Sequence, residues 1–160
     1  MLKSLDCSWR TSGVSSIKEL EALAPMGELF YEERENLPGR FNPVMWVQTW
    51  WSLLELPNFV MIQLLEPGGE PRGAIGGLAT PDLNTGEMIA VEQFWYVDPL
   101  ARGRGMSLLT AFETWAMDQG AVRVIIGHVW DADKTAAWKR MFAMKHYNPL
   151  EIHYYKELAG

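Results

Sequence analysis

Apolar residues recur every three or four positions along several parts of the chain, and this spacing predicts amphipathic helices. The first begins with the capping-box pattern Ser16-Ile17-Lys18-Glu19 and is predicted to end at Pro25. The second has Asn42 as its cap and Pro43 in the first helical position, and is predicted to last until Pro57. The segment between these two helices mixes charged and aromatic residues and is not assigned.

The pattern then changes to extended apolar runs bounded by turn residues, which predicts strands. The runs are Phe59–Leu65, Arg72–Thr80 and Met88–Val97, separated by glycine- and proline-containing turns at 66–69 and 81–86. Because these runs follow one another with short connections, they are expected to form consecutive antiparallel strands.

The last third alternates helix and strand. A helix is predicted over Met106–Gln119, with Leu108, Leu109, Phe112 and Ala116 on one face, and Gly120 ends it. A strand follows over Ala121–Val129, then a helix capped by Asp133, and a final strand over Leu150–Leu158. The unit from Met88 to Val129 is expected to be a right-handed crossover in a mixed sheet. The fold class is α+β.

Composition adds limits on partners and compartment. The 160 residues, 48% of them hydrophobic, predict one domain over residues 1–160. A net charge of −6 argues against nucleic acid or an anionic membrane as a partner, and no window reaches a membrane span. The single cysteine, Cys7, suits a reducing, cytoplasmic location, and a small buried side chain in an N-terminal strand is the preferred interpretation of it over a nucleophile. The oligomeric state is left open, with a homodimer as one option.

The most informative motif is Arg102-Gly103-Arg104-Gly105-Met106-Ser107, between the strand ending at Val97 and the helix that follows. Free N–H groups at a helix start, the positive end of the helix dipole, close backbone approach at glycine and two arginines together predict a phosphate-binding turn. A P-loop would need Lys-Ser/Thr after the last glycine, and Met106-Ser107 stands there. A dinucleotide fingerprint would need a third glycine where Leu108 stands.

This hexapeptide resembles the Arg/Gln-x-x-Gly-x-Gly/Ala pyrophosphate loop of the GNAT superfamily of N-acetyltransferases, with Ser107 in place of glycine or alanine. The lead-in Val97-Asp98-Pro99 and the order of elements match that family too. The segment His146–Lys156 resembles the family's ending, with His146 at the position of a family glycine. The resemblance implies a GNAT fold with helices on both faces of a twisted, mostly antiparallel mixed sheet and a splayed central strand pair.

The resemblance implies acetyl-CoA as the cofactor, an amine as the acceptor and no metal. Arg102, Arg104 and the backbone amides of Gly103, Gly105, Met106 and Ser107 would then hold the pyrophosphate. Backbone groups of Trp95, Tyr96 and Val97 would bind the pantetheine arm in the cleft between strand residues 92–97 and 122–129, and polarise the thioester carbonyl.

An amine that is protonated at neutral pH needs a base before it can attack. Glu92 is the candidate, because it lies in an otherwise apolar strand near where family members carry a base, and burial would raise its pKa. A glutamate on the exposed side of the sheet is the alternative. The family's acid, a tyrosine in the last helix, corresponds to Phe142 or, in another register, to Trp138, and both are interpreted as core aromatics. Tyr147 and His128 remain as other proton carriers.

Three tryptophans, Trp46, Trp50 and Trp51, cluster in the helix that borders the acceptor cleft in this fold. Packing against the sheet is favoured for Trp46 and Trp50, whereas Trp51 is the exposed candidate for holding a cation or a planar substrate. Glu32, Glu33 and Glu35 could attract a basic substrate, but a solvated run of charges is the favoured interpretation.

The sequence therefore predicts an acetyl-CoA-dependent N-acetyltransferase that transfers the acetyl group directly to an amine. The alternative is an inactive GNAT-fold protein that binds CoA or serves a structural role, which Phe142 favours and the glycine loop disfavours. A toxin acting on aminoacyl-tRNA is disfavoured by the net charge.

Overall fold

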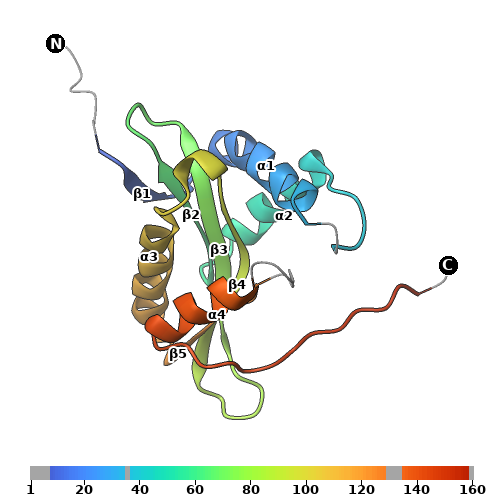
Figure 1. Cartoon of the computed structure of the whole chain (residues 1–160), viewed down its shortest axis with the longest axis vertical. Helices are drawn as coiled ribbons and strands as arrows, with labels where there is room; N and C mark the ends of the chain where they lie inside the picture. Colours follow the sequence, from blue (N-terminus) through green and yellow to red (C-terminus); the bar gives the residue numbers. More distant parts are fainter. Residues whose placement is uncertain (1–7, 35–36, 129–134, 159–160) are drawn as a thin grey trace.

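The computed structural model describes residues 8–34, 37–128 and 135–158 of the chain (Figure 1). Its strands are β1 (Arg10–Gly13), β2 (Phe59–Leu65), β3 (Pro71–Pro81), β4 (Met88–Val97) and β5 (Arg123–Ile125). Its helices are α1 (Ile17–Glu32), α2 (Pro43–Leu54), α3 (Gly105–Asp118) and α4 (Thr135–Met144), with a 3₁₀ turn at Pro99–Ala101. The α+β class is confirmed. Within the described ranges, no helix is long and apolar enough to cross a bilayer.

The five strands form one mixed sheet in the order β1-β2-β3-β4-β5. The first three pairings are antiparallel, and those of β2 with β3 and of β3 with β4 confirm the prediction from the short connections. The β4 strand pairs with β5 in parallel across the α3 crossover. Helices cover both faces of the sheet (Figure 1). Leu20, Leu23 and Trp50 of α1 and α2 are buried on one face, and Leu108, Leu109 and Phe112 of α3 on the other.

Two of the predicted helix starts are present in detail. Ser16 and Glu19 form the reciprocal capping box of α1. Asn42 accepts a hydrogen bond from the Met45 N–H at the start of α2. The third predicted cap, Asp133, lies outside the described residues, as do Cys7 and Glu35.

The predicted end of the first helix at Pro25 is wrong, because α1 continues through this proline to Glu32. Proline in a helix interior removes one backbone hydrogen bond and costs about 3 kcal/mol. Met26 and Gly27 directly after it are buried, and a Cβ on Gly27 would lie 2.7 Å from the Phe41 ring. Packing of this turn against the α2 region therefore offsets the cost of Pro25.

Two predicted strands differ from the structure. The run 121–129 forms a strand only at Arg123–Ile125, because its parallel partner β4 pairs no further than Val91. The predicted last strand over 150–158 is absent: this segment is exposed and extends away from the body of the protein (Figure 1). The short β5 edge offers few ladder groups for it to pair with.

A β-bulge interrupts β4 just before the loop end of the strand. Gly77 of β3 pairs with Glu92 and Gly76 pairs with Phe94, so Gln93 is an extra residue. The bulge inverts the facing of the strand: Ala90 packs with the α3 core, whereas Phe94 packs with the α1–α2 core. Bulges of this kind re-aim nearby side chains, and here Glu92 stands directly beside one.

His146 follows the end of α4, at the position where the family has a glycine, and its backbone conformation is one that favours glycine. His146 has φ 64°, in the left-handed region. Tyr147 N–H donates to the Phe142 carbonyl and His146 N–H to the Ala143 carbonyl, which together make a Schellman cap. Glycine is the residue that adopts this conformation without steric cost.

Replacing His146 by glycine is therefore expected to raise the free energy of unfolding by about 0.5–1 kcal/mol, because the left-handed cost to a side-chain-bearing residue exceeds the entropic cost of glycine. Chemical denaturation measures the change. Lys145→Gly, one residue earlier and not in the left-handed region, is the control and should destabilise. Equal destabilisation by both variants would contradict the assignment.

Candidate functional site

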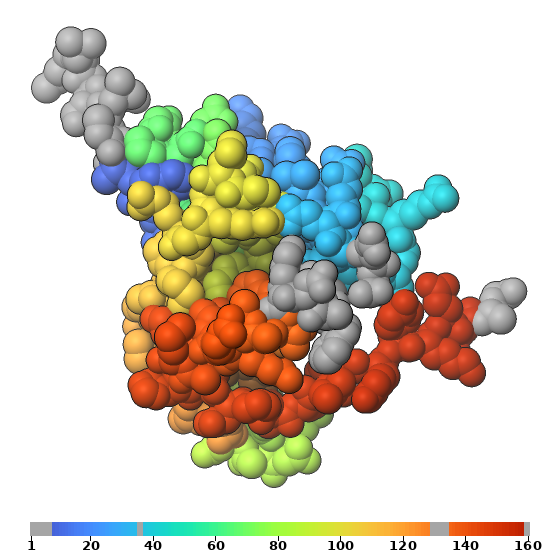
Figure 2. All heavy atoms as spheres, in the orientation of Figure 1, coloured from blue at the N-terminus to red at the C-terminus, as the bar shows by residue number. Residues whose placement is uncertain are grey.

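A cavity of about 470 Å³ opens between the end of β4, the loop before α3, the end of α1 and helix α4. In the space-filling view it is the recess enclosed by the yellow loop, the blue end of α1 and orange α4 (Figure 2). Its lining residues are Glu33, Arg34, Trp95, Tyr96, Val97, Arg102, Gly103, Gly105, Met106, Ala137, Trp138 and Met141. Seven of the ten residues predicted to form the site are among them, and Arg104, Ser107 and Glu92 are not.

The glycine loop presents free backbone donors to this cavity. Gly103 has φ 97°, a conformation that favours glycine, and a Cβ on Gly105 would lie 3.1 Å from a Val97 methyl group. Arg104 is the N-cap of α3 but makes no side-chain cap hydrogen bond. None of the N–H groups of Gly103, Gly105 and Met106 donates to another described residue. The start of α3 is thus an uncapped positive helix end.

The two arginines of the loop point in different directions. Arg102 lines the cavity and its Nη2 donates to Glu33 Oε2 at 2.6 Å. The Arg104 guanidinium instead lies over the Trp9 ring, 4.7 Å from its centroid. Ser107 donates its hydroxyl to the Arg104 carbonyl at 2.7 Å, which leaves it a local structural role.

Glu33 joins the end of α1 to the cavity wall. Besides its ion pair with Arg102, it accepts a 2.7 Å hydrogen bond from the Tyr96 hydroxyl. Burial and the neighbouring Glu33 carboxylate raise the pKa of Tyr96, so its hydroxyl keeps its proton at neutral pH. The sequence interpretation of Glu33 as part of a solvated charge run is therefore wrong.

The two central strands separate next to Glu92. Their pairing ends at Val91 and Ile125, and the Glu92 Oε2 accepts a hydrogen bond from the Gly127 N–H at 3.2 Å. Burial raises the pKa of Glu92 to about 7, although the Gly127 hydrogen bond acts in the opposite direction. A carboxyl group with this pKa can gain and lose a proton near neutral pH. Glu92 lies three residues before the lining residue Trp95 in the sequence and is not itself one of the lining residues.

Aromatic side chains join α4 to β4 and to the segment after β5. The Trp138 ring contacts the Trp95, His128 and Phe142 rings, at centroid distances of 5.7, 6.2 and 5.8 Å. Tyr147 packs on Phe142 and donates its hydroxyl to Glu113 at 2.8 Å. Trp138 and Phe142 are partly exposed, so the expectation of a buried core at these positions is only partly met.

The tryptophans of α2 pack into the fold. Trp50 is 7% exposed, and Trp46 and Trp51 pack against the same α1–α2 core. The interpretation of Trp51 as an exposed ligand-holding residue is therefore wrong, whereas packing of Trp46 and Trp50 is confirmed.

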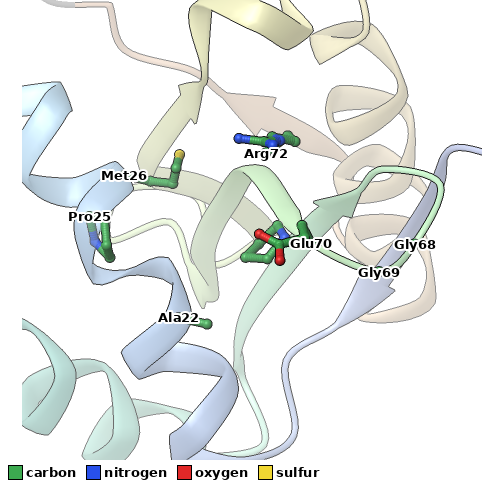
Figure 3. Close-up of a pocket in the computed structure, with 8 residues that line it drawn as sticks. Ala22, Pro25, Met26, Gly68, Gly69, Glu70 and Arg72 are labelled. Carbon is green, nitrogen blue, oxygen red and sulfur yellow. The ribbon is translucent and has the colours of Figure 1, made fainter.

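A second depression, of about 400 Å³, lies between α1 and the β2–β3 turn (Figure 3). Arg72 is its charged side chain besides Glu70, and it already pairs with Glu66 at 2.9 Å and with Asp98 at 3.8 Å. This depression contains no nucleophile or base with a shifted pKa near neutrality. The cavity beside β4 is therefore the candidate site.

Two residues of this region, Arg34 and Gly127, were missed from the sequence, and Glu33 was named there without being placed in the site. Glu33 and Arg34 belong to an acidic run with one arginine, and Gly127 lies in a stretch expected to be regular strand. The single arginine among glutamates was the available signal for Arg34. The contact between Glu92 and Gly127 depends on strand separation, which has no sequence signal of its own.

This combination of a mixed sheet, an uncapped helix start after β4 and a separation between β4 and β5 defines an acetyltransferase-type fold. The model of the acetyltransferase (GNAT) family matches residues 24–156, and the chain belongs to this family. No curated protein matches the chain in sequence.

Solved structures support the same fold at low sequence identity. An aminoglycoside acetyltransferase from an uncultured soil metagenomic sample, in complex with sisomicin, has a TM-score of 0.72 at 17% identity, covering 98% of this chain and 100% of its own. An acetyltransferase from Pyrococcus furiosus, described as putative, has 0.70 at 19%, covering 94% and 100%. Glucosamine-6-phosphate N-acetyltransferase from Arabidopsis thaliana has 0.68 at 11%, covering 95% and 99%.

Proposed function

We propose that this protein is an N-acetyltransferase that uses acetyl-CoA and transfers the acetyl group directly to an amine. The observation that carries the proposal is the juxtaposition of an uncapped glycine-loop helix start with a proton-accepting carboxylate at the end of one strand pair. Family membership supports acetyl transfer in general.

The cavity has the donors that a CoA pyrophosphate needs. The free N–H groups of Gly103, Gly105 and Met106 at the positive end of α3 would hold its oxygens, and Arg102 would add charge. The Trp95 indole Nε1 is buried without a hydrogen-bond partner among the described residues and lies 3.9 Å from the Cβ position of Gly105, so it would be one more donor to a ligand oxygen.

The separation between β4 and β5 offers a place for the pantetheine arm of CoA, which contains amide groups. Beyond Val91, the backbone groups that β4 turns toward β5 have no ladder partner. Trp95, Tyr96 and Val97 line the cavity along this stretch. An arm with amide groups could pair there as an additional strand would.

Acetyl-CoA, when bound, supplies a thioester whose carbonyl carbon accepts the attack of a neutral amine. Glu92 accepts the amine proton at its carboxylate, directly or through one water molecule. Its pKa of about 7 leaves a large share ionised at neutral pH while keeping it a useful base. The nitrogen–carbon bond forms, the carbon–sulfur bond breaks, and the electron pair leaves with the CoA sulfur.

No described residue is positioned to protonate a departing CoA thiolate, so this proton would come from water. Phe142 has no hydroxyl, and the Tyr147 hydroxyl donates to Glu113 and keeps its proton because burial raises its pKa. Burial also lowers the pKa of His128, so it is mostly neutral at pH 7. This lack of a positioned acid, among the residues that the structure describes, is the observation that favours the second candidate function, binding of CoA without turnover.

Arg102→Met is expected to weaken acetyl-CoA binding by about 10- to 100-fold, because it removes a charged donor from the cavity. Arg104→Met should change the dissociation constant by less than about threefold, since its guanidinium lies over Trp9. Isothermal titration calorimetry measures both. Equal effects of the two variants would contradict the proposed position of the pyrophosphate.

A further inference from the structure

Arg34 borders the cavity with a guanidinium group that has no ion-pair partner among the described residues. It lines the cavity one residue after Glu33, and its Nε and Nη1 are buried without a hydrogen-bond partner. Its guanidinium carbon lies 5.4 Å from the centroid of the Phe30 ring. A buried polar donor without an acceptor is unfavourable, so a ligand that supplies the acceptor explains why these nitrogens lie there.

The neighbouring carboxylate does not compensate for this charge. Glu33 is committed to Tyr96 and Arg102. Glu33 therefore binds Arg102 of the glycine loop, whereas Arg34 remains available to bind an anion.

Arg34 serves a different part of the cavity from Arg102. Arg34 lies on the cavity wall just after the end of α1, whereas Arg102 belongs to the glycine loop before α3. His128 follows Gly127, whose N–H binds Glu92, and its ring lies parallel to that of Trp138 on the cavity wall. Arg34 and Arg102 are therefore on different elements of the cavity wall, and Arg34 offers a cationic group that the glycine loop does not supply.

We propose that Arg34 binds a carboxylate of the acceptor, so that the substrate class is small amines that carry a carboxylate group, such as amino acids. The proposal rests on the proposed acetyl-transfer function. Glu92 would face the amino group and Arg34 the carboxylate, which a planar guanidinium can bind through two parallel hydrogen bonds. This selectivity is opposite to the basic acceptor that the net charge of −6 would suggest.

The test compares amino acids with their primary amides, which keep the amine and lose the negative charge. In the wild type, kcat/KM for the best amino acid should exceed that for its amide by about 10- to 100-fold. Arg34→Met should abolish this preference by lowering kcat/KM for the acid, while the amide changes less than about threefold. Arg34→Lys should keep part of it. Arg40→Met, which removes an exposed arginine six residues later, should leave it unchanged.

Two binding measurements keep the result interpretable. The affinity of each variant for acetyl-CoA should equal that of the wild type, and thermal melts should show that each variant folds. Calorimetry on the CoA-loaded protein should detect binding of the acid that Arg34→Met removes, even if no amine is acetylated. That last result would support the carboxylate site and overturn the acetyl-transfer function.

Equal binding and turnover of acid and amide by the wild type would overturn the carboxylate proposal while leaving acetyl transfer intact. Loss of acetyl-CoA affinity in Arg34→Met, with the acid preference unchanged, would assign Arg34 to the cofactor and would also overturn it.

Discussion

Glu92→Gln is expected to lower kcat/KM for amine acetylation by about 100- to 1000-fold at pH 8, because glutamine cannot accept the amine proton. Wild-type activity should rise with pH through about 7, where Glu92 loses its proton. The variant should lose this rise and retain only the one that reflects deprotonation of the free amine. Thiol release at saturating acetyl-CoA, measured between pH 5.5 and 9, gives both profiles.

Glu92→Gln should raise the free energy of unfolding at pH 8, although it lowers the activity. The pKa of Glu92 is raised from 4.5 to about 7 in the folded state, so the folded protein binds this proton more tightly than the unfolded chain. Its contribution to stability is then full below about pH 4.5 and is lost as the pH rises to about 7. Glu92→Gln should therefore be more stable than the wild type at pH 8, by on the order of 1–3 kcal/mol, and little changed near pH 4.5.

Glu70→Gln is the matched control, since Glu70 is exposed in the β2–β3 turn away from the cavity beside β4. It should leave the pH profile of the activity unchanged. An unchanged pH–rate profile in Glu92→Gln would remove Glu92 as the base.

Gly105→Trp is expected to raise the dissociation constant for acetyl-CoA by more than about 100-fold. A Cβ at position 105 points toward Val97 and the Trp95 indole, and both line the cavity. An indole attached there has to occupy the space beside the uncapped start of α3 and exclude a phosphate from its N–H groups. Calorimetric titration with acetyl-CoA measures the loss.

The control for this variant is Gly13→Trp on β1, where an added Cβ meets nothing within 4 Å. It should bind acetyl-CoA as the wild type does. Circular dichroism establishes that Gly105→Trp is folded before its affinity is interpreted. A folded Gly105→Trp protein with unchanged affinity would show that the cofactor does not bind at this loop.

Local patterns were enough to predict the elements that local chemistry determines. The strand Phe59–Leu65, the strand Met88–Val97 and the cap at Asn42 all occur where the sequence places them. The glycine loop was predicted because its backbone conformation requires glycine. Gly103 lies in the left-handed region, which other residues rarely adopt, so the residue type itself indicates the turn.

Features that depend on packing between distant segments were not predictable. Pro25 marks a helix end locally, and only burial of Met26 and Gly27 explains why α1 continues. The bulge at Gln93 reverses the facing of β4 without any glycine or proline in that strand. The role of Glu33 depends on Tyr96 and Arg102, which are more than sixty residues away in the chain.

Product analysis by mass spectrometry, after incubation of the protein with acetyl-CoA and a mixture of amino acids, amino-acid amides and polyamines, tests the central claim most directly. At least one N-acetylated amine should form in a one-to-one ratio with free CoA, and both products should be absent for Gly105→Trp. Tight binding of acetyl-CoA with no acetylated amine would contradict it, and would make this family member a CoA-binding protein without transferase activity.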